Sequence, residues 1–305
     1  MTGLLVVGDA ILDVTVAPSR PMRPGGDVAA VIRLGAGGQG ANVAVRLARR
    51  GASVRLAAPV SDDVSGRLLR EALSGDGVQL ADMPASRTAV VVALLDAGGE
   101  RSMLSDRQTI DTARVEAAMP GHDWIHVSAY ALVDDREGDA LAAALGRRPA
   151  GARLSLAGGS IAPEPAVVSR FLSRLEAARP DLLVVSREEA AALLGKPAQL
   201  ARDHARDLAG RAPLVLVTAG SAGSVAAIGG EIHEVPAPEL PGPALDSTGA
   251  GDAYVAAVIA DLAIGEWPPA VDDLRAAMER GSRAGGLVAR VVGAQGRIEG
   301  EATAT

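Results

Sequence analysis

Residues 245–263 read LDSTGAGDAYVAAVIADLA, a loop of small and hydroxyl residues that leads directly into an apolar helical stretch. Gly249, Ala250 and Gly251 stand immediately before that stretch. A loop of this kind points several unpaired N–H groups in one direction, with the positive end of the helix dipole behind them. The stretch therefore predicts an anion site suited to a phosphoryl group.

Asp252 stands in the first turn of the same predicted helix. A carboxylate there would repel a phosphate if binding were the only task, but it suits a general base that takes the proton from an attacking hydroxyl. The alternative is that Asp252 caps the helix and that the glycines form a tight turn. Asp246, Ser247 and Thr248 add oxygen ligands just upstream, which favours the functional interpretation.

A second small-residue loop, TAGSAG at 218–223, follows a predicted strand. Two phosphate-facing loops of this kind fit a nucleotide that lies across the carboxyl ends of a parallel sheet. A third glycine-rich stretch, GAGGQGAN at 35–42, matches the G-x-G-x-x-G pattern of dinucleotide-binding proteins, with Asp62 near the distance expected of a ribose-binding acid. That pattern belongs at the first strand, but the strand predicted at 4–7 leads into GDAILD, and a dehydrogenase leaves DSTGAGD unexplained.

The composition excludes several classes of protein. The 305 residues carry a formal net charge of −7, which argues against nucleic acid or an anionic membrane surface as a partner. No cysteine is present, so disulfides and a thiolate nucleophile are excluded. The N-terminal apolar run has no basic flank and no stretch is long enough to span a membrane, so we expect a cytoplasmic protein.

Short apolar runs alternate with helical stretches, which predicts an α/β fold with a mainly parallel sheet. We expect strands at 4–7, 54–58, 124–127, 153–156, 182–185 and 214–218. We expect helices at 41–50, 65–73, 134–145, 165–179, 187–194, 200–211, 252–263 and 271–292. Residues 13–35 and 86–105 are instead β-type runs around Gly/Pro turns, and we expect them to form a small β lid on a core of residues 1–12, 36–85 and 106–305. Exposed strand edges on the lid favour a homodimer that pairs through it.

Three motifs, in order, resemble the ribokinase-like (PfkB) family of sugar and nucleoside kinases over essentially the whole chain. They are GGQGANVAVRLARRGA at 37–52, SREEAAALLG at 186–195 and DSTGAGDAY at 246–254. The resemblance implies a three-layer α/β/α sandwich with a β lid. It also implies an ATP- and Mg²⁺-dependent kinase that phosphorylates a hydroxyl of a small sugar or sugar acid.

Matching positions to the family implies a role for each site residue. Asp252 is the catalytic base, and the loop of Gly249, Ala250 and Gly251 forms the anion hole. The implied substrate residues are Asp13, Gly37, Gly38, Asn42, Arg107 and Tyr130. The implied nucleotide residues are Ser186, Thr218, Gly220, Gly223 and Ser282. Glu189 matches the acid that organises Mg²⁺ through water, and Asp246 matches a residue near a monovalent cation, which is K⁺ in many members.

Departures from the family pattern keep alternatives open. Ser186 replaces the Asn of the Asn-x-x-Glu motif, Gln39 replaces a frequent Lys, and Arg297 falls where ribokinases carry a small hydroxyl residue near the cation. Tyr130 falls where ribokinases place a sugar-binding Glu, whereas Arg107 matches the carboxylate-binding Arg of 2-keto-3-deoxygluconate kinases. Aromatic residues make up only 2% of the chain, which disfavours a nucleoside acceptor because a base usually needs a stacking partner. A nucleotide-binding regulator without catalysis is the alternative from another class.

Overall fold

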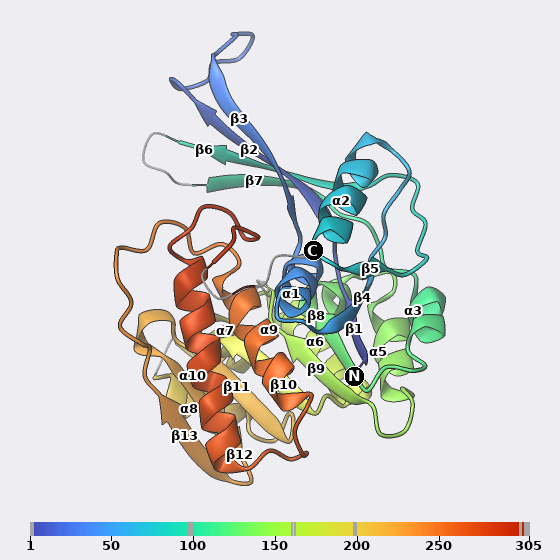
Figure 1. Cartoon of the computed structure of the whole chain (residues 1–305), viewed down its shortest axis with the longest axis vertical. Helices are drawn as coiled ribbons and strands as arrows, with labels where there is room; N and C mark the ends of the chain where they lie inside the picture. Colours follow the sequence, from blue (N-terminus) through green and yellow to red (C-terminus); the bar gives the residue numbers. More distant parts are fainter. Residues whose placement is uncertain are drawn as a thin grey trace.

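The computed structural model describes residues 3–96, 101–159, 161, 163–197, 200–298 and 301. Two sheets organise the chain (Figure 1). The strands of the larger sheet, in spatial order, are β13 (Glu231–Val235), β12 (Ser224–Ile228), β11 (Leu214–Thr218), β10 (Leu182–Ser186), β9 (Arg153–Ala157), β8 (Trp124–Ser128), β1 (Gly3–Val7), β4 (Ser53–Ala57) and β5 (Gln79–Leu80). All of them pair in parallel except β12 and β13, which continue the β11 edge as antiparallel strands.

Helices cover both faces of this sheet, and the apolar strand residues alternate between two cores. In β1, Leu5 and Val7 join one core, while Leu4 and Val6 join the other. The first core is closed by α3 (Thr112–Ala118), α4 (Ala129–Val133), α5 (Gly138–Gly146), α6 (Pro165–Ala178), α7 (Arg187–Leu194) and α8 (Ala201–Leu208). The second is closed by α1 (Gln39–Ala48), α2 (Val64–Gly75), α9 (Ala250–Leu262) and α10 (Val271–Val288). The predicted three-layer α/β/α fold with a mainly parallel sheet is therefore confirmed.

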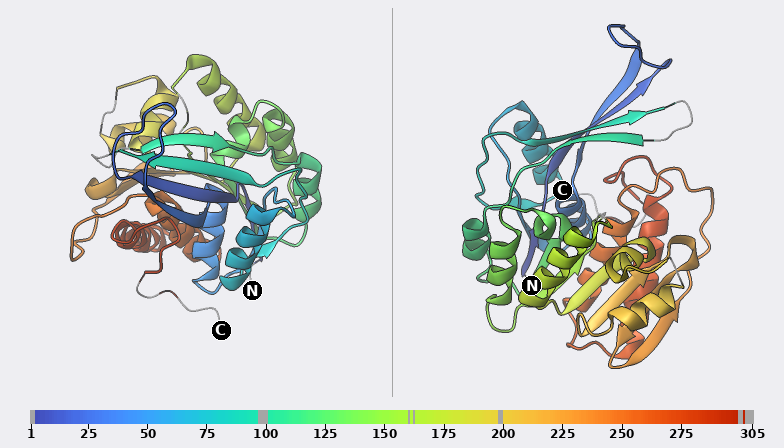
Figure 2. Two further views of the ribbon diagram at one scale, coloured as in Figure 1. Left: turned by 90° about the horizontal axis from the view of Figure 1, so that it is seen from above. Right: turned by 180° about the vertical axis from the view of Figure 1, so that it is seen from behind.

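The smaller sheet contains β3 (Ala30–Gly37), β2 (Ile11–Pro18), β6 (Ala89–Leu95) and β7 (Arg101–Asp106), in that order. The central pair β2 and β6 is parallel, and each strand carries an antiparallel partner on its outer side. One end of this sheet projects beyond the helices (Figures 1 and 2), while β2 and β3 pack against α2. Residues 97–100, which fall inside the segment predicted at 86–105, lie outside the described part of the chain.

Every strand that we predicted for the larger sheet is present, but β5, β12 and β13 were not predicted. The strands β12 and β13 form a hairpin whose turn is Gly229–Gly230, with φ of 58° and 84°, a pair of positive φ values typical of tight hairpin turns. The helix predicted at 134–145 was wrong at its start, because Asp134 Oδ1 accepts hydrogen bonds from the N–H groups of Arg136 (2.7 Å) and Glu137 (3.3 Å) and holds a turn before α5. None of the described helices is both long and apolar enough to cross a bilayer.

Candidate active site

The start of α1 and the start of α9 meet at the predicted site. Asn42 Nδ2 donates a hydrogen bond to Asp252 Oδ2 at 2.7 Å, across a sequence separation of 210 residues. The structure therefore joins the glycine-rich stretch near the N-terminus to the loop and helix at 245–263.

The Asp252 carboxyl has an unusual electrostatic environment. Burial raises its pKa to about 7, and the charge of Asp9 acts in the same direction. Hydrogen bonds from Asn42 and Gln39 and the charge of Arg46 oppose that rise. A carboxyl with a pKa near 7 is both ionised enough and basic enough to remove a proton at neutral pH.

The loop before α9 has the geometry of an anion site. Gly249 is the N-cap residue with φ 78°, a left-handed conformation that favours glycine. A Cβ on Gly249 would lie 2.7 Å from Cα and Cβ of Ala294, whereas a Cβ on Gly251 would meet nothing within 4 Å. Gly249 is thus packed against Ala294, while Gly251 in the first turn of α9 borders open space. The N–H groups of this turn and the helix dipole favour a negative charge there.

The predicted residues Asp13, Gly37 and Gly38 lie together at the start of α1. A Cβ on Gly37 would lie only 2.0 Å from Asp13 Oδ2, so the carboxylate rests directly on the glycine backbone. Gly38, with φ 96°, is the N-cap of α1, and a Cβ there would lie 2.6 Å from the carbonyl oxygen of Asp9. Gly37, the last residue of β3, therefore lies against the Asp13 side chain of β2, and Gly38 lies against the backbone of the loop after β1.

Asp9 was not predicted as a site residue, although its position directly after the first strand was a signal. Its Oδ2 pairs with Nη1 of Arg107, and its Oδ1 accepts a hydrogen bond from the N–H of Gly40 at 3.3 Å. The Arg107 guanidinium also lies over the Tyr130 ring, 4.1 Å from its centroid. Arg107 and Tyr130, both predicted as substrate residues, are therefore neighbours, and the charge of Arg107 is already balanced by Asp9.

Gln39 connects this cluster to the next strands. Its Nε2 donates to the carbonyl oxygen of Gly158, and its Oε1 accepts from Ser128 Oγ. A Cβ on Gly158 would lie 2.2 Å from Glu189 Oε2, so the Glu189 carboxylate packs against this glycine. Glu189, the acid predicted to organise the metal, therefore packs against Gly158. The carbonyl oxygen of Gly158 accepts a hydrogen bond from Gln39, which follows the predicted substrate residue Gly38.

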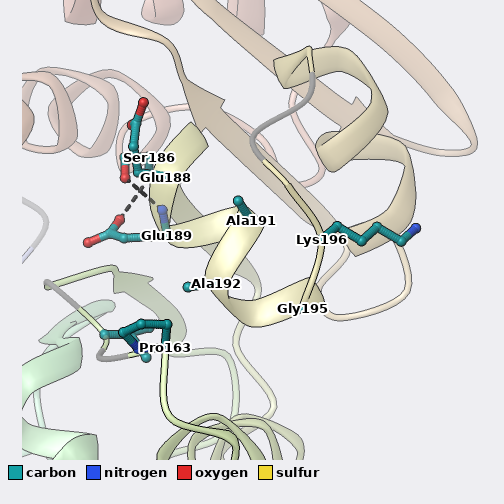
Figure 3. Close-up of a pocket in the computed structure, with 9 residues that line it drawn as sticks. Pro163, Ser186, Glu188, Glu189, Ala191, Ala192, Gly195 and Lys196 are labelled. Atoms are coloured by element: carbon teal, nitrogen blue, oxygen red, sulfur yellow. Dashed lines mark hydrogen bonds between the residues drawn. The ribbon is translucent and has the colours of Figure 1, made fainter.

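Ser186 and Glu189 form a reciprocal capping box at the start of α7 (Figure 3). The N–H of Glu189 donates to Ser186 Oγ at 3.1 Å, and the N–H of Ser186 donates to Glu189 Oε2 at 2.8 Å. A pocket lies beside this helix start, lined among others by Ser186, Glu189 and Lys196 (Figure 3). The backbone N–H of Ser186 therefore fixes the position of the Glu189 carboxylate.

These residues fit Mg²⁺ of the kind that nucleotides carry. Among the described residues, no group of three or more His, Cys, Asp or Glu side chains could hold a metal ion by itself. Mg²⁺ in kinase sites keeps several waters and uses one or two carboxylates together with substrate phosphates. The single oriented carboxylate of Glu189 meets that requirement.

Besides Ser186, three of the predicted nucleotide residues lie at the end of β11 and in the turn after it, and the fourth, Ser282, lies on α10. Thr218 ends β11 and stands opposite Ser186 in the β10–β11 register. Gly220 begins a short 3₁₀ turn, and Gly223, with φ 95°, packs so closely that a Cβ would lie 2.1 Å from the carbonyl oxygen of Val235. Ser282 is half-buried on α10, three residues before Gly285, where a Cβ would lie 2.8 Å from the carbonyl oxygen of Ala250.

Asp246 holds the loop before α9 in place. Its Oδ1 accepts from the N–H (3.0 Å) and the Oγ1 (2.6 Å) of Thr248, and its Oδ2 accepts from the N–H of Gly293 (3.0 Å). Arg297, at the position that we expected beside a monovalent cation, instead pairs with Asp76 Oδ1 at 3.3 Å.

Comparison with known proteins decides the family. The model of the pfkB family carbohydrate kinases matches residues 1–299. The chain belongs to this family. It is accordingly a carbohydrate kinase, a phosphotransferase with an alcohol group as acceptor, as the resemblance of its motifs predicted.

Relatives within the pfkB family include fructokinases. A fructokinase of Klebsiella pneumoniae is 33% identical over 246 residues, which cover 74% of this chain and 76% of the relative. A fructokinase of Salmonella typhimurium is 32% identical and covers 85% of this chain and 87% of its own length. The crystal structure of a fructokinase from Vibrio cholerae O395, with fructose, ADP and calcium bound, has a TM-score of 0.77 at 24% identity and covers 97% of this chain and 95% of its own.

Proposed function

We propose that this pfkB kinase transfers the γ-phosphoryl group of MgATP to a hydroxyl of a small neutral sugar, with a ketohexose such as fructose as the first candidate. The observation that carries the proposal is the 2.7 Å hydrogen bond between Asn42 and Asp252, beside the open N-terminus of α9. This bond joins the Asn42 amide to a carboxyl with a raised pKa at the start of a helix whose N–H groups suit a phosphoryl group, which supports the proposed roles of the two residues. The fructokinase names of the relatives support the choice of sugar.

In the proposed reaction, Asp252 accepts the proton of the acceptor hydroxyl while the hydroxyl oxygen bonds to the γ-phosphorus and the bond to the leaving ADP breaks. The N–H groups of Ala250 and Gly251 stabilise the charge on the transferred group. Thr218, Gly220, Gly223 and Ser282 hold the nucleotide. Glu189 would hold Mg²⁺ through water, and the ion would neutralise phosphate charge when bound.

The Asp9–Arg107 pair favours a neutral sugar over a sugar acid. An Arg that binds a substrate carboxylate must be able to form an ion pair with that group. Arg107 instead pairs with Asp9 and lies against the Tyr130 ring. A sugar acid would bring a second carboxylate next to Asp9, whereas a neutral sugar needs only the hydrogen-bonding capacity of the three side chains.

An ATP-consumption screen over fructose, other hexoses, pentoses, 2-keto-3-deoxygluconate and ribosides tests the proposal. We expect the highest kcat/KM with a neutral sugar, and we expect Asp9→Asn to raise the relative rate with the sugar acid. A preference of the wild-type chain for the sugar acid would refute the neutral-sugar assignment. No turnover of any acceptor would instead favour a nucleotide-binding regulator.

We also propose that the smaller sheet is a lid over the core and that two copies pair through it. Its outer strands β3 and β7 expose large apolar side chains, namely Val31, Ile32, Leu34, Met103 and Leu104, each more than half exposed. Unpaired edge strands with such side chains are suited to a second copy of the same sheet. Sedimentation at assay concentration should give a dimer that Ile32→Asp converts to a monomer, and a monomeric wild type would refute the pairing.

A further inference from the structure

The segment 293–298 is fastened to α1 by two arginines. Arg46 is 1% exposed, and its Nη2 donates to the carbonyl oxygens of Ala294 (2.7 Å) and Gly296 (2.8 Å). Arg49 Nη1 donates to the carbonyl oxygen of Gln295 at 2.8 Å. The backbone on both sides of Gln295, and at Gln295 itself, is therefore fixed relative to the helix that carries Asn42.

From this fixed backbone the Gln295 side chain reaches the active site. Its Nε2 donates to Asn42 Oδ1 at 3.1 Å, and Asn42 Nδ2 in turn donates to Asp252 Oδ2 at 2.7 Å. Three residues from three separate segments thus form one chain of hydrogen bonds that ends on the proposed base.

The donor and acceptor groups determine how the Asn42 amide is oriented between Gln295 and Asp252. An ionised carboxylate only accepts hydrogen bonds, so Asn42 must turn its NH₂ group toward Asp252. Its carbonyl oxygen then needs a donor on the opposite side, and the NH₂ group of Gln295 supplies one. We propose that Gln295 is a positioning residue that holds the Asn42 amide in the orientation that stabilises ionised Asp252. The inference rests on the proposed role of Asp252 as the base.

The other groups around Asp252 have opposing effects on its pKa. Burial and the charge of Asp9 favour the protonated carboxyl, while Arg46, Gln39 and Asn42 favour the ionised form. Without a donor at position 295 the Asn42 amide is free to turn its oxygen to Asp252, which then favours the protonated carboxyl. Removing the donor should therefore raise the pH at which Asp252 loses its proton.

Two substitutions at position 295 test the inference. Gln295→Met keeps the length of the side chain without the donor, and Gln295→Glu presents only acceptors to Asn42 when it is ionised. The Asn42 side-chain amide resonance of ¹⁵N-labelled full-length protein, followed against pH, reports the titration of Asp252 without need of a substrate. We expect the midpoint to rise by about 0.5 to 1 pH unit with Gln295→Met, and further with Gln295→Glu. The acid limb of the kcat/KM profile should move by the same amount.

Val292→Glu is the matched control, because it adds the same charge three residues away at a side chain that is 65% exposed. An equal shift with this variant would mean that charge alone moves the midpoint, and it would overturn the inference. An unchanged midpoint in folded Gln295→Met would also overturn it, whether or not Gln295→Glu folds. Absence of turnover in the wild type would refute the proposed function, while the amide titration would still decide the role of Gln295.

Discussion

Replacing Asp252 with asparagine separates its proposed catalytic task from its effect on stability. The wild-type carboxyl, with a pKa of about 7 in the folded protein, ionises there only at an energetic cost. Its pKa lies above the ordinary value of 3.8 expected in the unfolded chain, so the unfolded state releases the proton first. Stability from this group is therefore full below pH 3.8 and falls as the pH rises, until the folded carboxyl is also ionised above pH 7.

The size of the change in the free energy of unfolding depends on the pH range over which unfolding is measured. Between pH 5.5 and the folded pKa of about 7, a span of roughly 1.5 pH units, the free energy of unfolding of the wild type falls by about 2 kcal/mol. The substituted side chain does not titrate, so Asp252→Asn should gain about 2 kcal/mol relative to the wild type between pH 5.5 and pH 8. Urea unfolding at the two pH values measures this change, and comparing the variant with the wild type at each pH removes the titration of other groups.

The same variant should lose catalysis. General-base catalysis contributes about 10²- to 10⁴-fold, so kcat should fall by at least ~10²-fold while sugar binding by calorimetry changes little. Asp272→Asn is the control, because it removes an exposed carboxylate from the first turn of the neighbouring helix α10. Near wild-type turnover of Asp252→Asn, or a stability difference that is the same at both pH values, would refute the reasoning.

Three further outcomes follow from named contacts. Glu301→Gln leaves the buried Arg46 without its 2.7 Å ion pair and should lower the free energy of unfolding by ~3 kcal/mol, whereas Asp62→Asn, at an exposed pair, should cost less than ~1 kcal/mol in urea unfolding. Gly38→Ala must adopt φ 96° and should cost at least ~2 kcal/mol and raise the KM for sugar, so an unchanged KM would contradict the role of this turn. Replacing K⁺ with Na⁺ should change kcat by less than about twofold, because the Asp246 carboxylate already uses three of its about four acceptor sites; a strong dependence on K⁺ would show that the cation competes with them.

The sequence could predict those parts of the fold in which a short sequence pattern and the residues that interact lie close together along the chain. Buried parallel strands such as β10 and β11 read as short continuous apolar runs. The helix predicted at 187–194 from its helical period has the observed bounds of α7, and the Ser186–Glu189 capping box at its start is likewise a local feature. The hairpin of β12 and β13 was missed although Gly229–Gly230 marked its turn, because its alanine-rich first strand does not have a typical β composition.

The missing site residues depend on contacts that no local pattern reveals. Asp9 follows the first strand in a motif that otherwise served only to exclude a dehydrogenase, and its pairing with Arg107 spans 98 residues. Gln295 lies 253 residues from Asn42 and belongs to a segment without regular structure. Hydrogen bonds of this kind depend on tertiary packing, whereas helix starts and glycine turns are defined within a few residues.

The ion pair between Arg46 and Glu301 also has a consequence for folding during translation. The two residues are 255 positions apart, so at 5–20 residues per second the ribosome adds Glu301 about 13 to 50 seconds after Arg46. During that interval α1 carries a cation that cannot be buried with its native partner. The early strands can pair before then, but the contacts between α1 and the segment of Gln295 form only after residues 293–301 have been translated. Chains that end before residue 293 should therefore lack activity even where much of their sheet is folded.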